Sequence, residues 1–279
     1  MRGQLLALSL SIMTMAPAAA NTTADKLERS VCGWLREPLA FALWSRAAGR
    51  PADRVARRVD GARVEPVTHR TADGRSLHGF RLRPETAPGA GFVLVAQGNA
   101  MLADHLLGEI APLAAGGREV YIFDYRGYGA SEGRPRLKAI VADYVRIAAE
   151  LAASPGGPAS FYGISFGGIV LSNVVGAGAS YARLVIDSSP ARVSPFGCPK
   201  RYDPVENLPA DASGILLVRG ELDTVVPPAM TREFAETVQA RGGQVVTRRD
   251  FAHPFMDFDF AAHAARQALI RSFLLGETR

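Results

Sequence analysis

Short apolar runs alternate with longer amphipathic stretches over most of this 279-residue chain. The apolar runs and their flanks predict strands at residues 92–96, 120–123, 159–162, 184–186, 215–218 and 244–248. Helical spacing of apolar residues predicts helices at 102–115, 137–153, 166–174, 228–240 and 258–275. Apolar strands that alternate with helices are typical of an α/β fold with a mostly parallel central sheet and helices on both faces.

The region before this alternation follows a different pattern. Residues 64–70 and 77–83 predict two antiparallel strands at one edge of the sheet, joined by the turn at 71–74. Residues 25–47 have helical spacing, with a break or kink expected at Pro38. We favour a helix packed on the core, and the alternative is peripheral membrane contact through Trp34, Phe41 and Trp44. The chain is therefore divided into an N-terminal helical segment at 21–61 and a main domain at 62–279.

The first twenty residues have the features of a signal peptide. Arg2 is followed by an apolar run at 5–15 and by the small residues at 18–20. We expect an exported protein, periplasmic or secreted, with an uncleaved membrane anchor as the alternative. Export makes Cys32 and Cys198 candidates for a disulfide, although a buried thiol and a separate surface thiol fit the sequence as well.

Charge narrows the choice of partners only slightly. The formal net charge is +5, and almost all basic residues are arginine. No basic run is interleaved with aromatic residues, so we expect no nucleic-acid partner.

The candidate chemistry is concentrated in the stretch Gly163-Ile164-Ser165-Phe166-Gly167. It lies between a predicted strand and a predicted helix and fits the pattern G-x-S-x-G of a nucleophile elbow. The sharp turn brings strand and helix backbones so close that only glycine fits two residues either side of the serine. The helix start also directs its positive end at negative charge that develops on a substrate.

A serine nucleophile needs a base, and the base needs an orienting acid. Asp223 and His253 each follow a later predicted strand, and functional groups gather beyond the carboxyl ends of parallel strands. Asp187 also follows a strand and is the competing candidate for the acid.

With these partners the chain resembles the α/β-hydrolase superfamily, in the branch of serine aminopeptidases, lysophospholipases and acyl-protein thioesterases. The resemblance rests on the elbow, on residues 123–133 (Phe-Asp-Tyr-Arg-Gly-Tyr-Gly-Ala-Ser-Glu-Gly) and on residues 220–223 leading into Val226-Pro227. It implies that Ser165 is the nucleophile, His253 the base and Asp223 the acid, in the chain order of that fold. It implies no metal and no organic cofactor.

The resemblance also predicts the surroundings of the serine. The oxyanion hole should consist of the backbone N–H groups of Phe166 and Asn99, in a loop where relatives usually have His-Gly and this chain has Gln97-Gly98. Five prolines between residues 187 and 214 oppose a helical cap, so we expect little or no cap domain and an open site. Its aromatic lining is expected to include Phe166, Phe196, Phe251 and Phe255.

These features predict an exported serine hydrolase that cleaves carboxylic esters or thioesters, with a lipid or other small molecule as substrate. A serine peptidase or aminopeptidase is the alternative enzyme. A hydrolase-like scaffold that binds a ligand without turnover is the alternative of a different class.

Overall fold

The structure is a computed structural model, and it describes residues 32–33, 36–53, 55–85, 89, 91–153 and 157–277. The predicted signal peptide, the first part of the helix expected at 25–47 and Trp34 lie outside the described residues.

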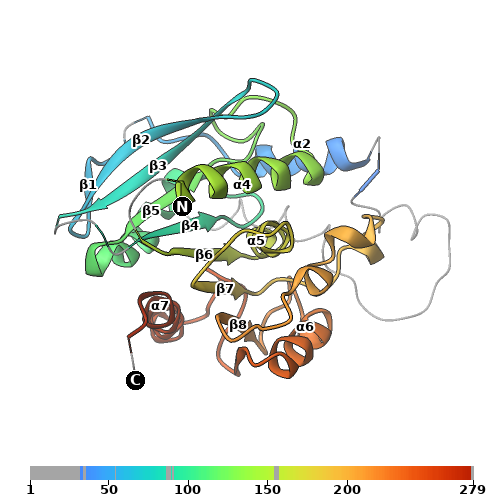
Figure 1. The fold of residues 1–279 in the computed structure, drawn as a ribbon. Coiled ribbons are helices and arrows are strands. Elements are labelled where there is room, and N and C mark those ends of the chain that lie inside the picture. Colours follow the sequence, from blue (N-terminus) through green and yellow to red (C-terminus); the bar gives the residue numbers. More distant parts are fainter. Residues whose placement is uncertain are drawn as a thin grey trace.

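One sheet of nine strands forms the centre of the molecule (Figure 1). Its strands lie in the order β1-β2-β3-β5-β4-β6-β7-β8-β9. The first four of these pair antiparallel, and all pairs from β5–β4 to β8–β9 are parallel. The bounds are β1 Arg58–Val59, β2 Ala62–Arg70, β3 Ser76–Pro84, β4 Phe92–Ala96, β5 Glu119–Phe123, β6 Ala159–Ile164, β7 Arg183–Asp187, β8 Ile215–Gly220 and β9 Gln244–Arg248. The mostly parallel sheet and its antiparallel N-terminal strands are those that the sequence predicts.

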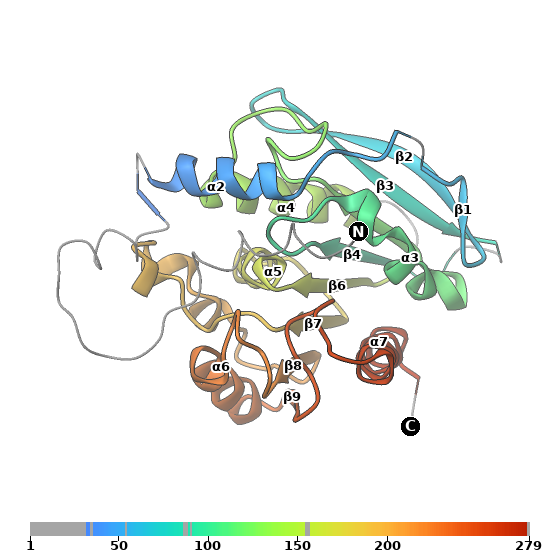
Figure 2. The ribbon, with the colours of Figure 1, turned by 180° about the vertical axis from the view of Figure 1, so that it is seen from behind.

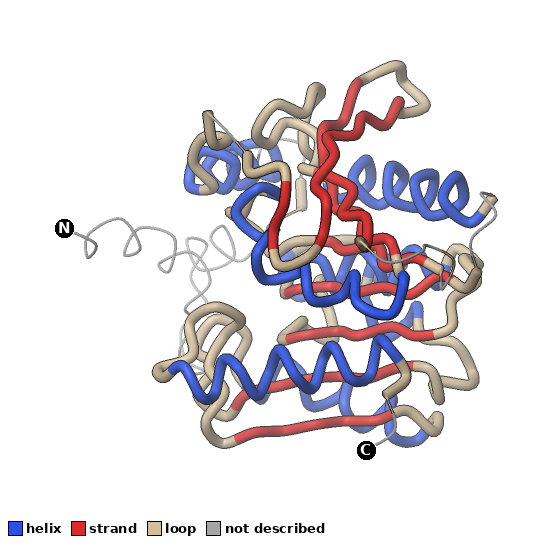
Figure 3. The backbone as a smooth tube through the Cα atoms, turned by 90° about the vertical axis from the view of Figure 1, so that its left-hand side faces the viewer, coloured by secondary structure: helices blue, strands red, loops and turns tan. Residues whose placement is uncertain are grey.

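Helices cover both faces of the sheet because successive side chains of the inner strands are apolar and point to opposite faces. In β4, Leu94 packs into one core cluster and Val93 into the other. The first cluster takes in α4 (Leu137–Ala152), α5 (Phe166–Gly176) and α6 (Pro228–Ala240). The second takes in α7 (Phe260–Leu275) and the short helices after β4. Figure 1 shows α5 and α6 on one side of the strands and α7 on the other, and Figure 3 looks at the side that carries α7.

Two predicted helices differ from the expectation. The segment expected as one helix at 102–115 is divided into a 3-10 turn at Ala103–Leu106 (η2), α3 at Leu107–Ile110 and a second 3-10 segment at Ala111–Gly117 (η3). Gly108 weakens a helix, and Pro112 cannot donate to the preceding turn, so the hydrogen-bond ladder changes there. The described part of the 25–47 helix is α2, Arg36–Ala47. Pro38 does not break it, because this proline lies in the first turn, where no intrahelical partner for an N–H exists.

The stretch between β7 and β8 forms no helical cap. It contains three 3-10 turns, η4 Ser194–Phe196, η5 Lys200–Tyr202 and η6 Pro204–Asn207. Cys198 lies in this stretch and forms a disulfide with Cys32, with 4.7 Å between their Cα atoms. The bond that the sequence left open is therefore present.

Helix α2 is fastened at its N-terminal end. Beside the disulfide, the Cys32 N–H donates to the Phe196 carbonyl, 3.2 Å away. The Glu37 carboxylate accepts hydrogen bonds from the Leu137 backbone N–H (2.7 Å) and the Arg136 guanidinium (2.9 Å) at the start of α4. Figure 2 shows α2 passing in front of α4. Within the described ranges, no helix has the length and apolar character that crossing a membrane requires.

Candidate active site

Ser165 lies at the turn between β6 and α5, in a backbone conformation that L-residues rarely adopt (φ 52°, ψ −111°). Its N–H donates to the Asp187 carbonyl (2.8 Å), and its carbonyl accepts from the Gly168 N–H (2.9 Å). A side chain on Gly163 would meet the α5 backbone at Gly168, and one on Gly167 would collide with the carbonyl oxygen of Ala96. The two glycines of the pattern are thus required by the close approach of strand and helix.

His253 and Asp223 meet beyond the ends of β9 and β8. The His253 Nδ1 atom lies 2.9 Å from Asp223 Oδ2. The other carboxylate oxygen, Oδ1, accepts the backbone N–H groups of Val225 (2.9 Å) and Val226 (2.8 Å). Three contacts on one buried carboxylate fix its orientation. With Nδ1 protonated toward Asp223, the Nε2 atom of the imidazole is left to act as a base.

Ser165 and His253 line the same cavity, which has a volume of about 310 Å³. The lining is largely apolar: Trp44, Gly98, Asn99, Ala100, Met101, His105, Ile164, Ser165, Val225, His253, Pro254, Phe255 and Met256. His105 is the second histidine of the cavity, but the acid nearest to it, Asp104, is 3.8 Å away from its Nε2 atom. The cavity thus contains a serine at a strand-to-helix turn and a histidine that contacts a buried acid. Such an arrangement can perform nucleophilic catalysis on a carbonyl carbon.

Asp187, the competing acid, has a different partner. Its carboxylate binds the Arg266 guanidinium at 2.6 Å, and both side chains are fully buried. Burial raises the pKa of Asp187, and the charge of Arg266 opposes this shift. The structure places Asp223, and not Asp187, against the ring of His253.

A family model for the alpha/beta hydrolase family matches residues 77–278. The chain belongs to this family. An uncharacterised protein of Mycobacterium tuberculosis (strain H37Rv) is 30% identical over 234 residues, which cover 76% of this chain and 81% of the relative.

Solved structures share the fold of this α/β-hydrolase at low sequence identity. The Pyrococcus furiosus esterase Pf2001 is 17% identical, with a TM-score of 0.64 over 81% of this chain and 95% of the esterase. XC6422 of Xanthomonas campestris, described as an α/β serine hydrolase without lid, is 19% identical, with a TM-score of 0.57 over 76% of this chain and 92% of that protein.

Arg266 is the residue of this hydrolase that sequence reasoning missed. Its guanidinium donates to the carbonyl of Ala252 (2.6 Å) and to both oxygens of Asp257 (2.9 and 3.0 Å). Asp257 in turn accepts the Ala252 N–H at 2.8 Å. Arg266 thus holds both backbone groups of the residue that precedes His253. The only signal in the sequence was an arginine on the otherwise apolar face of a helix, with Ala262 and Ile270 four residues either side.

The loop predicted to supply an oxyanion donor is held by tyrosines from the segment 123–133. The hydroxyl of Tyr125 donates to the Gln97 carbonyl (2.6 Å), and that of Tyr128 donates to Asn99 Oδ1 (2.8 Å). The side chain of Gln97 is fully buried, with its Nε2 atom 3.5 Å from Asp124 Oδ1. Gln97 is therefore directed into the protein, while Gly98 and Asn99 line the cavity.

The rest of that segment locks a tight loop, as the sequence indicates. Arg126 binds Asp143 at 2.6 and 2.7 Å and reaches Asp73 in the β2–β3 turn at 3.2 Å. Gly127 and Gly129 have φ values of 74° and 53°, which favour glycine.

Phe196, Phe251 and Phe255 are the members of the expected lining that would contact substrate, and only Phe255 lines the cavity. Phe251 is instead buried and stacks under Arg266, whose Cζ lies 4.3 Å from the ring centroid. Phe196 lies in η4, outside the cavity wall. Loop position predicted both incorrectly, because it does not fix the direction of a side chain.

The fourth aromatic residue expected in the lining also lies behind it. The ring of Phe166 packs edge-on against Phe41 (5.7 Å between centroids) and Tyr125 (5.4 Å). The aromatic ring that does form a wall is Trp44 of α2, which the sequence analysis did not assign to the site.

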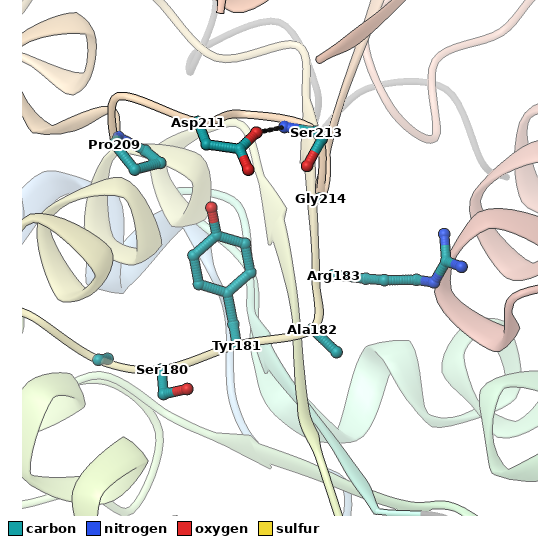
Figure 4. A pocket seen from close by; sticks show the side chains of 9 residues that line it. Ser180, Tyr181, Ala182, Arg183, Pro209, Asp211, Ser213 and Gly214 are labelled. Carbon is teal, nitrogen blue, oxygen red and sulfur yellow. Dashed lines mark hydrogen bonds between the residues drawn. The ribbon is translucent and has the colours of Figure 1, made fainter. Parts of the chain in front are cut away.

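A second hollow, of about 500 Å³, lies at the opposite ends of the strands (Figure 4). Arg183 begins β7 and Gly214 precedes β8, so this hollow is at the amino ends of these parallel strands, opposite to the edge of the sheet where Ser165 and Asp223 lie. Its Asp211 carboxylate accepts the Ser213 N–H at 2.9 Å. The described residues contain no group of three or more His, Cys, Asp or Glu placed to hold a metal ion.

Proposed function

We propose that this protein is a serine hydrolase that cleaves carboxylic esters or thioesters with an acyl or lipid-like group. The observation that carries the proposal is the 2.9 Å contact between His253 Nδ1 and Asp223 Oδ2, with the same histidine and Ser165 lining one cavity. Membership of the hydrolase family supports it, because the residues lie in that fold's order of serine, acid and histidine.

In this mechanism His253 Nε2 accepts the Ser165 proton as the hydroxyl oxygen attacks the substrate carbonyl carbon. Asp223 holds the imidazole in the required tautomer and stabilises the imidazolium that forms. The backbone N–H groups of Phe166 and Asn99 bind the negative oxygen of the tetrahedral intermediate. His253 returns the proton to the leaving alcohol or thiol. Water then attacks the acyl-enzyme with His253 again as base, which releases the acid and restores Ser165.

The cavity favours an acyl group over an aminoacyl group. Its walls are mostly aromatic, aliphatic and thioether side chains, such as Trp44, Ile164 and Met256. No residue of the lining is Asp or Glu, so nothing there offers a charge partner to the free ammonium of an aminopeptidase substrate. This absence of a carboxylate is the reason to place esters and thioesters ahead of peptides.

Two measurements on purified protein test the proposal. A fluorophosphonate probe should label the protein and should not label the Ser165→Ala variant, because the hydroxyl forms the covalent bond. A panel of acyl esters, acyl thioesters and aminoacyl amides should then give turnover on the first two. A folded protein that the probe does not label would favour a binding scaffold, and selective turnover of the amides would favour a peptidase.

Export is part of the same proposal. The residues that suggest a signal peptide lie outside the described part of the chain. The Cys32–Cys198 disulfide supports export, because such bonds persist in oxidising compartments. N-terminal sequencing of protein from a cell envelope or medium should give a start at or near Asn21, and a start at Met1 in the membrane fraction would indicate an anchor.

A further inference from the structure

Large apolar side chains are exposed in segments that also contribute residues to the site. In the described part of the chain these are Leu39, Leu43, Leu222, Phe258 and Phe260, and the two phenylalanines are 81% and 84% exposed. Each belongs to a segment that also builds the site. Leu39 and Leu43 lie on α2 with Trp44, Leu222 precedes Asp223, and the phenylalanines follow the cavity residue Met256.

Helix α2 is apolar on two faces. Phe41 and Trp44 are buried toward the core, which excludes them from the membrane contact considered from the sequence. The outer face instead carries Leu39, Ala42, Leu43, Arg46 and Ala47, all exposed and at helical spacing. A helix on the surface of a globular protein usually has a polar outer face. This one has a single charge there, and that charge is positive.

The two apolar segments lie on one side of the molecule. Seen from behind in Figure 2, α2 is in front, and in Figure 3 α2 and the loop that leads into α7 are at the same end of the strands. This is the carboxyl end, where Ser165 and the cavity lie. The end of the molecule that carries the cavity therefore also carries exposed apolar groups from the N-terminal and C-terminal parts of the chain.

We propose that this face docks on a lipid surface, with Leu39 and Leu43 on one side of the cavity mouth and Phe258 and Phe260 on the other. The aliphatic side chains on α2 and the aromatic side chains before and at the start of α7 are of the kinds that insert at the boundary between headgroups and acyl chains. Arg46 is exposed in the last turn of α2 and Arg50 shortly after it, and the outer face of α2 carries no carboxylate, which suits anionic headgroups. A second copy of the chain on this face would instead cover the mouth.

Docking has a consequence that rests on the proposed function. When the protein is bound in this way, its cavity opens toward the layer of the membrane that contains acyl chains. A lipid ester would therefore reach Ser165 without crossing bulk water. The binding itself does not depend on turnover. It is therefore measured on the full-length Ser165→Ala protein, which leaves the lipids intact.

The first experiment measures sedimentation with vesicles of phosphatidylcholine, with and without phosphatidylglycerol. Phe258→Gln/Phe260→Gln and Leu39→Gln/Leu43→Gln should each weaken binding by about 100-fold, or about 10-fold for each apolar side chain withdrawn from lipid. Ala152→Gln/Ala153→Gln is the matched control, because both alanines are exposed at the far end of α4, toward the amino ends of the strands. Unchanged binding in both patch variants would overturn the proposal.

The second experiment locates the contact and separates it from any binding by residues 1–31. Phe260→Trp in the full chain should add fluorescence that brominated phosphatidylcholine quenches, whereas Ala152→Trp should add fluorescence that it does not quench. Vesicle-bound protein with an unquenched Trp at position 260 would mean that another segment holds the lipid, and the proposal would fail. Concentration-dependent dimerisation without vesicle binding, lost in the patch variants, would identify a second copy as the occupant instead.

A third arm connects docking with turnover. In protein with Ser165 intact, Phe258→Gln/Phe260→Gln should hydrolyse a soluble short-chain ester at the parent rate and a vesicle-borne ester at least about 10-fold more slowly. Equal rates on both substrates would show that docking does not deliver substrate. No turnover by the parent protein would instead contradict the proposed function and leave the binding result standing.

Discussion

Asp124 offers a quantitative test of the loop beside the serine. Its buried carboxyl accepts the Ala103 N–H at 2.7 Å and faces Gln97, whose Oε1 atom has no hydrogen-bond partner. Burial raises the pKa of Asp124 from the ordinary 3.8 to about 7. The hydrogen bond from the Ala103 N–H lowers this pKa, and the negative charge of the neighbouring Asp104 raises it. The folded protein therefore binds a proton here that the unfolded chain has lost at pH 5 to 6.

The sign of the effect follows from proton linkage. Because the pKa is higher in the folded state, the stabilisation is complete below the unfolded value of 3.8 and is lost as the pH rises to about 7. A shift of about three pKa units corresponds to roughly 4 kcal/mol. Asp124→Asn keeps an oxygen that can accept from Ala103 and removes the titration. Relative to the parent, this variant should gain about 4 kcal/mol in the free energy of unfolding between pH 4 and pH 7.5.

Urea denaturation of both proteins at four pH values across that range measures the difference. Asp73→Asn, measured instead from pH 4 down to about pH 2, is the control with the opposite sign, because hydrogen bonds from Thr71 and then Arg126 lower the pKa of Asp73 to about 2. That contribution is present above pH 3.8 and is lost as the pH falls toward 2. A difference between Asp124→Asn and the parent that stays constant with pH, or that declines as the pH rises, would refute the reasoning.

Three further changes test the site and its supports. Asp223→Asn should lower turnover about 10⁴-fold if it fixes the tautomer of His253. A larger kinetic loss in Asp187→Asn would show that the acid is misassigned. Arg266→Met should lower the free energy of unfolding by about 3–5 kcal/mol, because it leaves two buried carboxylates unpaired, and an unchanged urea midpoint would contradict this. Replacing both cysteines by serine should cost up to ~5 kcal/mol for a 166-residue separation, and two free thiols in unfolded, unreduced protein would disprove the bond.

The features that the sequence predicts well are local in origin. Apolar runs identify the inner parallel strands, and β4 has the predicted bounds, because a strand buried on both faces excludes polar residues along its whole length. The edge strand β9 and helix α6 also have the predicted bounds, although β9 is not buried. The elbow is predicted for a similar reason, since the close approach of β6 and α5 admits only glycine at 163 and 167. Asp223 and His253 follow from topology, because parallel strands end at one edge.

The features that the sequence leaves open depend on the direction of side chains. Phe251 and Phe255 are four residues apart in one loop, yet one stacks under Arg266 and the other lines the cavity. Phe255 has a φ of 65°, in the left-handed region, which no pattern of residues in the sequence predicts. The partner of Arg266 is likewise fixed by tertiary packing, since Asp187 is 79 residues away in the chain.

The N-terminal segment contributes to the cavity of this hydrolase although it lies outside the residues that the family model matches. The family model begins at residue 77, whereas α2 ends at Ala47. Yet α2 supplies the Trp44 wall of the cavity, and its Phe41 ring packs on Phe166, the residue next to Ser165. The disulfide and the hydrogen bonds of Glu37 fasten this helix to the stretch between β7 and β8 and to the start of α4. Substrate preference should therefore depend on α2, and esterases that share only the fold are a poor guide to it.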